Sequence, residues 1–168
     1  NFPEAEQHYA RALAVLATAP DDVLRAKVVI EQANNAWFQG RYQEAFEQQR
    51  VAYGLAREQG WALGQVIALN TSGLVWWTLG DNDRALRELA RALDAAAAIE
   101  GRQDEVATTL NNIGLVYREM GRYDAARETL ERALAIDRRL KSRWAVAYDL
   151  RNLGLTLLRK GEAPVEPM

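Results

Sequence analysis

Asparagine, tryptophan and arginine side chains recur along the chain with spacings that suit recognition of a polypeptide. The asparagines are Asn34, Asn70 and Asn111, and two of the tryptophans are Trp37 and Trp77. An asparagine amide can donate to and accept from an extended peptide backbone. Tryptophan and arginine are enriched among the residues that anchor interfaces, and an arginine fork can bind a carboxylate. Two arginines, Arg118 and Arg151, complete the set.

The residues needed for catalysis or for metal binding are scarce. The 168 residues include no cysteine and a single histidine, His8. This excludes zinc-thiolate sites and cysteine nucleophiles. Acidic pairs such as Asp104-Glu105, and Glu128 with Glu131, have the spacing of exposed helical charge. Because no glycine-rich phosphate loop or nucleophile-and-base set is present either, we expect no enzyme, no catalytic residue, no metal and no cofactor.

Charge and hydropathy narrow the class of partner. The formal net charge of −2 gives no basic patch or stripe for nucleic acid. No apolar run approaches the roughly 20 residues that cross a bilayer. The first residues, Asn1 to Glu4, lack the pattern of a signal peptide. We therefore expect a cytoplasmic protein with no nucleic-acid or membrane partner.

A repeat of about 40 residues positions these side chains. Gly40, Gly80, Gly121 and Gly161 are separated by 40, 41 and 40 residues. Fixed periods of this length are typical of stacked repeat arrays. Small residues recur in phase with the glycines: Ala45, Ala85 and Ala126; Ala52, Ala92 and Ala133; and Gly73, Gly114 and Gly154. We expect these small residues to lie where two helices approach closely.

Between the glycines, apolar residues recur every three to four positions, which predicts helices almost throughout. Asp21 and Ser142 are the expected N-caps, and Gly60 and Gly101 are the expected left-handed closing residues. The residues after Gly161 include two prolines, so 162–168 are expected to form a disordered tail. The eight predicted helices span 4–18, 22–39, 42–59, 61–79, 83–100, 103–120, 123–141 and 143–160.

The residues around the third glycine carry a specific resemblance. Leu110, Ile113-Gly114 and Tyr117, then Gly121-Arg122-Tyr123-Asp124, Ala126 and Ala133-Leu134, closely resemble the tetratricopeptide repeat (TPR) pattern. Leu69, Gly73, Trp76, Gly80, Ala85 and Ala92-Leu93 match it again. The long repeat period resembles that of the TPR subclass found in Leu-Gly-Asn-repeat adaptors, kinesin light chains and bacterial TPR regulators. The resemblance implies an all-α, right-handed α-solenoid of antiparallel helix pairs.

The resemblance also implies that one stripe of each first helix lines a concave groove that binds a partner. On the last first helix this stripe is Tyr148, Arg151, Leu155 and Leu158. Two alternatives stay open: the asparagines could bond neighbouring helices, and Trp37 and Trp77 could be covered by an adjacent repeat. Trp61 and Trp144 are expected to fill gaps between repeats. The candidate groove residues are Asn34, Trp37, Asn70, Leu74, Trp77, Asn111, Leu115, Arg118, Tyr148 and Arg151.

The repeat phase predicts one array over 1–161. It consists of a half repeat (1–20), three repeats (22–60, 61–101 and 102–141) and a half repeat (142–161). Because neither end resembles a polar capping helix, we expect a fragment of a longer protein or ends that pack on another copy. The leading hypothesis is a protein-interaction scaffold that binds a peptide or helix in the groove. The alternatives are homotypic assembly through the ends and a ligand-sensing segment of a larger signalling or transcription protein.

Overall fold

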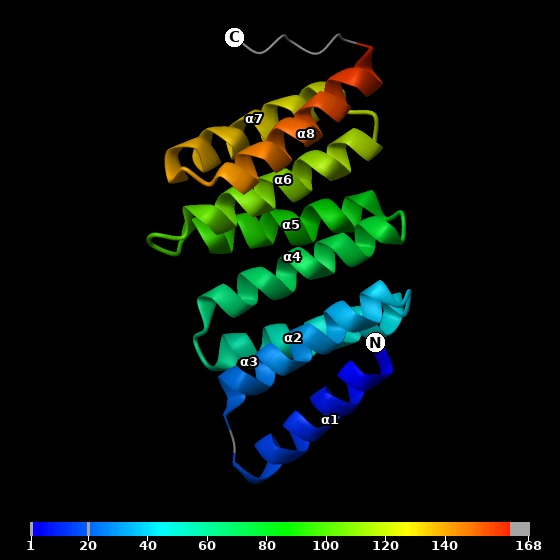
Figure 1. Ribbon diagram of the computed structural model, residues 1–168, viewed down its shortest axis with the longest axis vertical. Helices are drawn as coiled ribbons and strands as arrows, with labels where there is room; N and C mark the ends of the chain where they lie inside the picture. The colour runs from blue at the N-terminus through cyan, green and yellow to red at the C-terminus, as the bar shows by residue number, and fades with distance from the viewer. Residues whose placement is uncertain (1, 20, 162–168) are drawn as a thin grey trace. The chain divides into compact units, whose positions relative to one another are not determined.

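The computed structural model describes residues 2–19 and 21–161, and within them every regular element is an α-helix (Figure 1). The predicted all-helical class is therefore confirmed, whereas the expected tail at 162–168 lies outside the described residues. The fifth helix ends at Ala97, earlier than expected. The helices are α1 (Phe2–Thr18), α2 (Asp22–Phe38), α3 (Tyr42–Glu58), α4 (Ala62–Thr78), α5 (Asn82–Ala97), α6 (Gln103–Glu119), α7 (Tyr123–Leu140) and α8 (Arg143–Lys160).

The chain divides into two compact units, Asn1–Ala95 and Ala96–Met168. In the first, α2 packs against α3 and α3 against α4, while α1 lies along α2. In the second, α7 packs against both α6 and α8. Each unit thus contains antiparallel helix pairs joined by short turns, as the repeat pattern predicts. A single array over 1–161 remains a prediction.

The turns contain the residues that their backbone conformations require. Asp21 caps α2, because its carboxylate accepts a hydrogen bond from the Leu24 backbone N–H at 2.8 Å. Gly60 and Gly101 have φ angles of +63° and +75°, in the left-handed region that glycine enters without strain. Ser142 occupies the N-cap position of α8, but its side chain makes no capping hydrogen bond. Ser142 therefore stands at the predicted N-cap position without forming the capping hydrogen bond.

Two glycines set the spacing between paired helices. A Cβ atom added at Gly73 would lie 2.6 Å from Cγ of Leu89, and one at Gly114 would lie 2.7 Å from Cγ of Leu130. Both leucines are fully buried. The small residues in phase were therefore correctly predicted to mark close approach at these two positions. Gly154 differs, since a Cβ there would meet nothing within 4 Å.

The first full repeat departs from this arrangement. Ala33 stands at the register of Gly73 and Gly114, and Gln49 stands at the register of Leu89 and Leu130. Both Ala33 and Gln49 are fully buried. The Gln49 amide nitrogen and oxygen have no hydrogen-bond partner. A buried amide without partners costs stability, roughly 1–3 kcal/mol, so the α2–α3 pair is the weaker version of the same packing.

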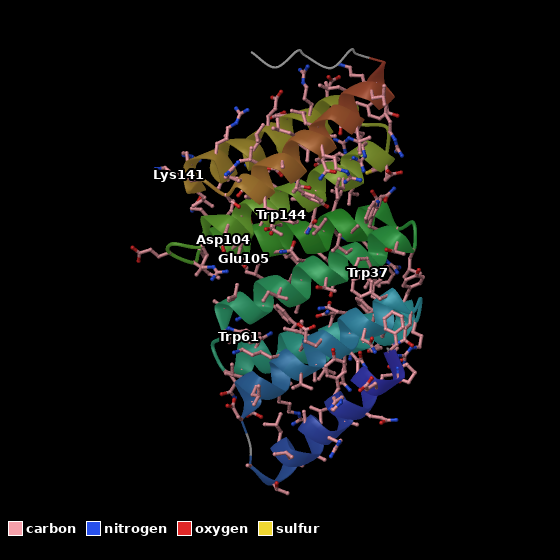
Figure 2. All side chains as sticks on the ribbon, viewed as in Figure 1. Trp37, Trp61, Asp104, Glu105, Lys141 and Trp144 are labelled. Carbon is pink, nitrogen blue, oxygen red and sulfur yellow. The ribbon has the colours of Figure 1, made fainter. Side chains whose placement is uncertain are left out.

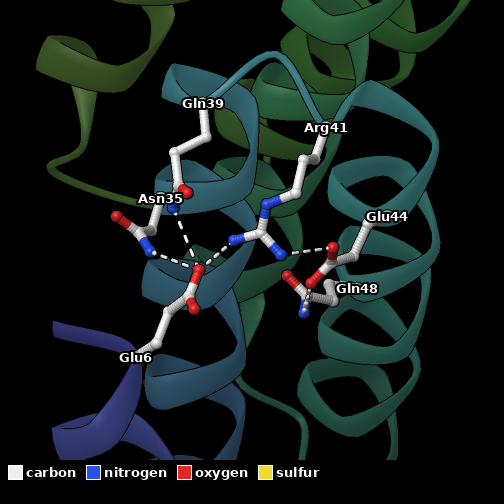
Figure 3. A network of polar contacts seen from close by, with 6 residues as sticks. All are labelled: Glu6, Asn35, Gln39, Arg41, Glu44 and Gln48. Atoms are coloured by element: carbon white, nitrogen blue, oxygen red, sulfur yellow. Dashed lines mark hydrogen bonds and ion pairs between the residues drawn. The ribbon is translucent and has the colours of Figure 1, made fainter. Parts of the chain in front are cut away.

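A polar network attaches α1 to the next two helices (Figure 3). One carboxylate oxygen of Glu6 accepts hydrogen bonds from Asn35, from Gln39 at 3.0 Å, and from Arg41. Arg41 also forms an ion pair with Glu44 at 2.5 Å. No described residue of α1 is itself buried. Glu6 therefore supplies much of the specific attachment of this helix.

The glycine contacts predict opposite effects for the same substitution at equivalent positions of different repeats. Gly73→Ala and Gly114→Ala should each destabilise the fold by about 1–3 kcal/mol, because the added methyl group overlaps a buried leucine. Gly154→Ala should instead stabilise it by up to about 1 kcal/mol, since a helical glycine is replaced without a clash. Chemical denaturation of the three variants tests this contrast, which equal effects would contradict.

Replacing Gln49 with an apolar residue of similar shape should stabilise the protein. Gln49→Met removes two unpartnered polar atoms and should raise the free energy of unfolding by about 1–2 kcal/mol. The exposed Gln43→Met is the matched control and should stay within about 0.5 kcal/mol of the parent. Urea denaturation measures both, and a destabilised Gln49→Met would show that the amide is satisfied in solution.

Candidate functional site

In the first unit, the predicted groove residues come from α2 and α4 and differ in exposure. Asn70 is buried, while Asn34, Leu74 and Trp77 are half-buried. Trp37 is also half-buried, and it packs against the buried cluster of Ala36, Ala45 and Val75. Its indole N–H donates to the Thr78 hydroxyl at 3.1 Å. Trp37 (labelled in Figure 2) therefore bridges α2 and the end of α4 while part of its surface stays open.

In the second unit, Asn111 joins α6 to α8. Its side chain is 4% exposed. Its amide N–H donates to the Asp149 carboxylate, and its amide oxygen accepts from Asn152 at 2.9 Å. The alternative that an asparagine bonds a neighbouring helix thus describes Asn111. Substituting Asn111 would break this contact between helices, so it is a poor probe of binding.

An exposed stripe of mainly apolar residues runs along α8. Trp144, Tyr148, Arg151, Leu155 and Leu158 are all exposed. Their spacing of four, three, four and three residues places them on one helix face. Trp144 and Tyr148 stack with their rings 7° from parallel and their centroids 5.5 Å apart. The stripe therefore presents an aromatic pair at its N-terminal end and leucines at its C-terminal end.

A hollow of about 220 Å³ opens beside the aromatic pair, between α6 and α8. A single water needs only about 15 Å³ by the same measure, so the hollow has room for a side chain. Thr108 and Asn111 line it from α6, Tyr148 and Asp149 from α8, and Asp137 from α7. No lysine or arginine borders it. The hollow is therefore acidic on one side and aromatic on the other.

Asp137 and Asp149 are the two buried carboxylic acids in the described part of the chain. Burial raises the pKa of Asp149 to about 6. The hydrogen bond from Asn111 lowers this pKa, and the nearby Asp137 raises it further. Burial likewise raises the pKa of Asp137, and Asp104 adds to that rise. No basic group is among the causes of either shift. The buried pair therefore holds a proton more readily than two exposed carboxyls would.

The opposite end of the surface is basic. Burial, followed by repulsion from Arg159, lowers the pKa of the Arg118 guanidinium, and Arg151 acts in the same direction. One terminal nitrogen of Arg118, Nη1, is buried without a hydrogen-bond acceptor. Glu119 lies 3.8 Å from Arg118 and pairs with Arg159 at 2.8 Å. Leu115, one turn earlier on α6, is buried. A charge gradient therefore runs along this surface, from the carboxyl pair to the arginines.

The sequence interpretation missed three residues that shape the hollow. Trp144 was expected to fill a gap between repeats, but it is 77% exposed and labelled at the start of α8 in Figure 2. Asp137 and Asp149 were not singled out. The repeat register contains a signal for both, because the equivalent positions of other repeats hold small, buried residues. These are Ala56 and Ala96 for Asp137, and Ala68 and Thr109 for Asp149.

Two other kinds of site were searched for in the described residues. Nowhere in 2–19 and 21–161 do three histidine, cysteine, aspartate or glutamate side chains gather closely enough to hold a metal ion. Over the same ranges, no helix combines the length and the apolar character needed to cross a membrane.

Comparison with known proteins identifies the repeat. The tetratricopeptide repeat family profile matches residues 65–139, which contain the two glycines that seat Leu89 and Leu130. Residues 65–139 carry tetratricopeptide repeats. No curated protein sequence is significantly similar to it. Because the match spans α4 to α7, the predicted TPR pattern is confirmed on the helices for which the sequence resemblance was strongest.

Solved structures share the helical fold over most of the chain. BtubC (BKLC) from P. vanneervenii is 25% identical, with a TM-score of 0.82 over 96% of this chain and 67% of its own. A Rap protein complexed with Competence and Sporulation Factor is 18% identical, with a TM-score of 0.84 over 96% of this chain and 45% of its own. The TPR-like repeats of a putative kinesin light chain from Podosopora anserina are 16% identical, with a TM-score of 0.71, and the match covers 95% of this chain and 79% of theirs. The chain thus spans less than half the length of the Rap protein.

The carboxyl pair predicts how the stability of the TPR fold depends on pH. With its pKa at about 6, folded Asp149 keeps a proton between about pH 4 and pH 6 that the unfolded chain releases, so stability falls as pH rises through this window. Asp149→Asn should remove this loss, amounting to up to roughly 3 kcal/mol, and should exceed the parent in stability at pH 7.5. Denaturant titrations at pH 4.5, 6 and 7.5 measure it, with the exposed Glu128→Gln as control. An unchanged slope in Asp149→Asn would contradict the assignment.

Proposed function

We propose that this chain is a non-enzymatic protein-interaction module that binds an extended peptide segment of a partner along α6 and α8. Two structural neighbours support this class of partner, because one is complexed with a factor and the other with a peptide. One is the Rap protein complexed with Competence and Sporulation Factor. The other is the Rap conjugation gene regulator of the plasmid pLS20 in complex with the Phr* peptide, which is 18% identical with a TM-score of 0.69.

The observation that carries the proposal is the exposed stripe of α8. From Trp144 to Leu158 it rises through 14 residue-to-residue steps, or about 21 Å at 1.5 Å per residue. An extended peptide of about six residues has the same length. Trp144 and Leu158 remain 77% and 67% exposed. Covering such apolar side chains would contribute about 25 cal/mol for each square ångström removed from water.

Charge gives the proposed peptide a direction. The buried Nη1 of Arg118 and the exposed Arg151 lie toward the leucine end of the stripe and suit a carbonyl or carboxylate of the partner. The other end is bordered by Asp137 and Asp149. A peptide placed in the reverse direction would bring like charges together, which disfavours binding.

The predicted residues of the first unit form a second contact surface in this proposal. Trp37 and Trp77 each keep an open part, and Asn34, three residues before Trp37 on α2, is half-buried. Asn70 and Leu74 belong to the same stripe of α4. We assign these residues to recognition of the partner, with Trp37 positioned by its hydrogen bond to Thr78.

The test starts from a random heptapeptide library displayed on phage and selected against the full chain. Enriched peptides are synthesised with a fluorophore, and their affinity is measured by fluorescence polarisation. Tyr148→Ala and Leu155→Ala should each weaken binding about tenfold or more, as expected for anchors at the centre of an interface. Arg132→Ala, an exposed residue of α7, is the matched control and should change nothing. Failure to enrich any peptide, or equal loss in all three variants, would refute the α6–α8 surface.

A second candidate function is homotypic assembly through α8. It is favoured by Leu150, which is 46% exposed on a different face from the stripe. Sedimentation equilibrium across a hundredfold concentration range separates the two functions. A dimer that dissociates on Leu150→Glu, and not on Tyr148→Ala, would favour assembly, whereas a monomer throughout would remove this candidate.

A further inference from the structure

The hollow between α6 and α8 ends at a buried carboxyl pair, Asp137 and Asp149, that no lysine or arginine borders. Asp149 is 2% exposed, and its Oδ2 atom has no hydrogen-bond donor. Its other oxygen, Oδ1, accepts from Asn111. The neighbouring Asp137 is itself acidic and buried, so it cannot neutralise an ionised Asp149. A buried carboxylate normally has a cation or several donors as partners.

The aromatic residues that line the hollow suit a cation, as the carboxyl pair at its base does. The rings of Trp144 and Tyr148 stack on each other, and both residues line the hollow. Aromatic faces attract ammonium and guanidinium groups, and arginine stacks on them especially well. Thr108 adds an exposed hydroxyl from α6. The volume of about 220 Å³ exceeds that of one or two waters severalfold.

We propose that this hollow is a specificity pocket for a basic side chain of the bound peptide, with arginine preferred over lysine. The guanidinium passes along Trp144 and Tyr148 and forms its hydrogen bonds with Asp149 and Asp137 at the base. This inference rests on the proposed peptide-binding function, and it specifies which residue of the peptide binds at the N-terminal end of α8. An arginine fork donates several N–H groups at once, which matches two adjacent carboxyls better than a lysine does.

Binding of a cation by this pair must be linked to pH. The titratable groups around the base are Asp149 of α8, Asp137 of α7 and Asp104 of α6, with Tyr148 at the border. Because the pKa of Asp149 is raised to about 6, a cation that needs the ionised pair displaces a proton below that pH. Affinity for arginine should therefore rise as pH increases from 5 to 7.5.

The direct test uses a small probe, so that it does not depend on knowing the partner. N-acetyl-arginine methylamide is titrated into the full chain while the indole N–H resonance of Trp144 is followed by NMR. The neutral citrulline derivative, which keeps the shape of arginine without its charge, is the matched ligand. We expect saturable shifts with arginine that are at least about tenfold weaker with citrulline, with Asp149→Asn, and at pH 5. Glu128→Gln should bind as the parent does.

The outcomes separate this inference from the peptide-binding function. Equal binding of citrulline and arginine, or an undiminished response in Asp149→Asn, overturns the basic pocket. Selected heptapeptides that depend on Tyr148 and Leu155 but lack arginine and lysine also overturn it, while leaving peptide binding intact. Heptapeptides with a fixed basic residue, whose affinity falls in Asp149→Asn and not in Arg132→Ala, support both. Should Asp149→Asn fold poorly, the citrulline and pH comparisons on the parent chain decide the question alone.

Discussion

The close approach of paired helices at Gly73 and Gly114 is the constraint on which the other features depend. Each glycine leaves room for a leucine of the following helix to lie against the backbone. With the helices at this distance, the alanines that follow the turns are fully buried. The other faces of the first helices are then left free for different side chains. The small residues therefore determine the packing of the repeat, while other residues of the same helices determine the chemistry of its surface.

Some repeats keep the small and apolar residues of this packing at every position, and others replace one of them with a polar residue. Gln49 introduces an unsatisfied amide where Leu89 and Leu130 supply an apolar knob. Asp137 and Asp149 introduce carboxyls where other repeats have alanine or threonine. Natural proteins retain such departures from packing rules mainly at functional or strained sites. The carboxyl pair borders an open hollow and so fits the first description.

Much of this structure could be predicted from the sequence, because a repeat presents each structural requirement several times. The positive φ of Gly60 and Gly101, most of the helix bounds and the Gly73 and Gly114 contacts followed from the sequence pattern, whereas the end of α5 at Ala97 did not. The hollow could not be predicted in the same way, because it depends on residues that occur once. Trp144 lies near a helix start, where its side chain could be directed either inward or outward. The engagement of Asn111 depends on Asp149 and Asn152, which are about 40 residues away in sequence and adjacent only after α8 packs.

The attachment of α1 has a consequence for the order in which the chain opens. No described side chain of α1 is buried, and its polar contacts converge on one oxygen of Glu6. Leu13 is only partly buried, against the cluster around Val29. Detachment of α1 therefore breaks few contacts and leaves the α2–α3 pair folded, so it is a local event with its own small free energy. Backbone amides of α1 should exchange with solvent through this opening, long before those of α2, and a protease would cleave the chain first between these two helices.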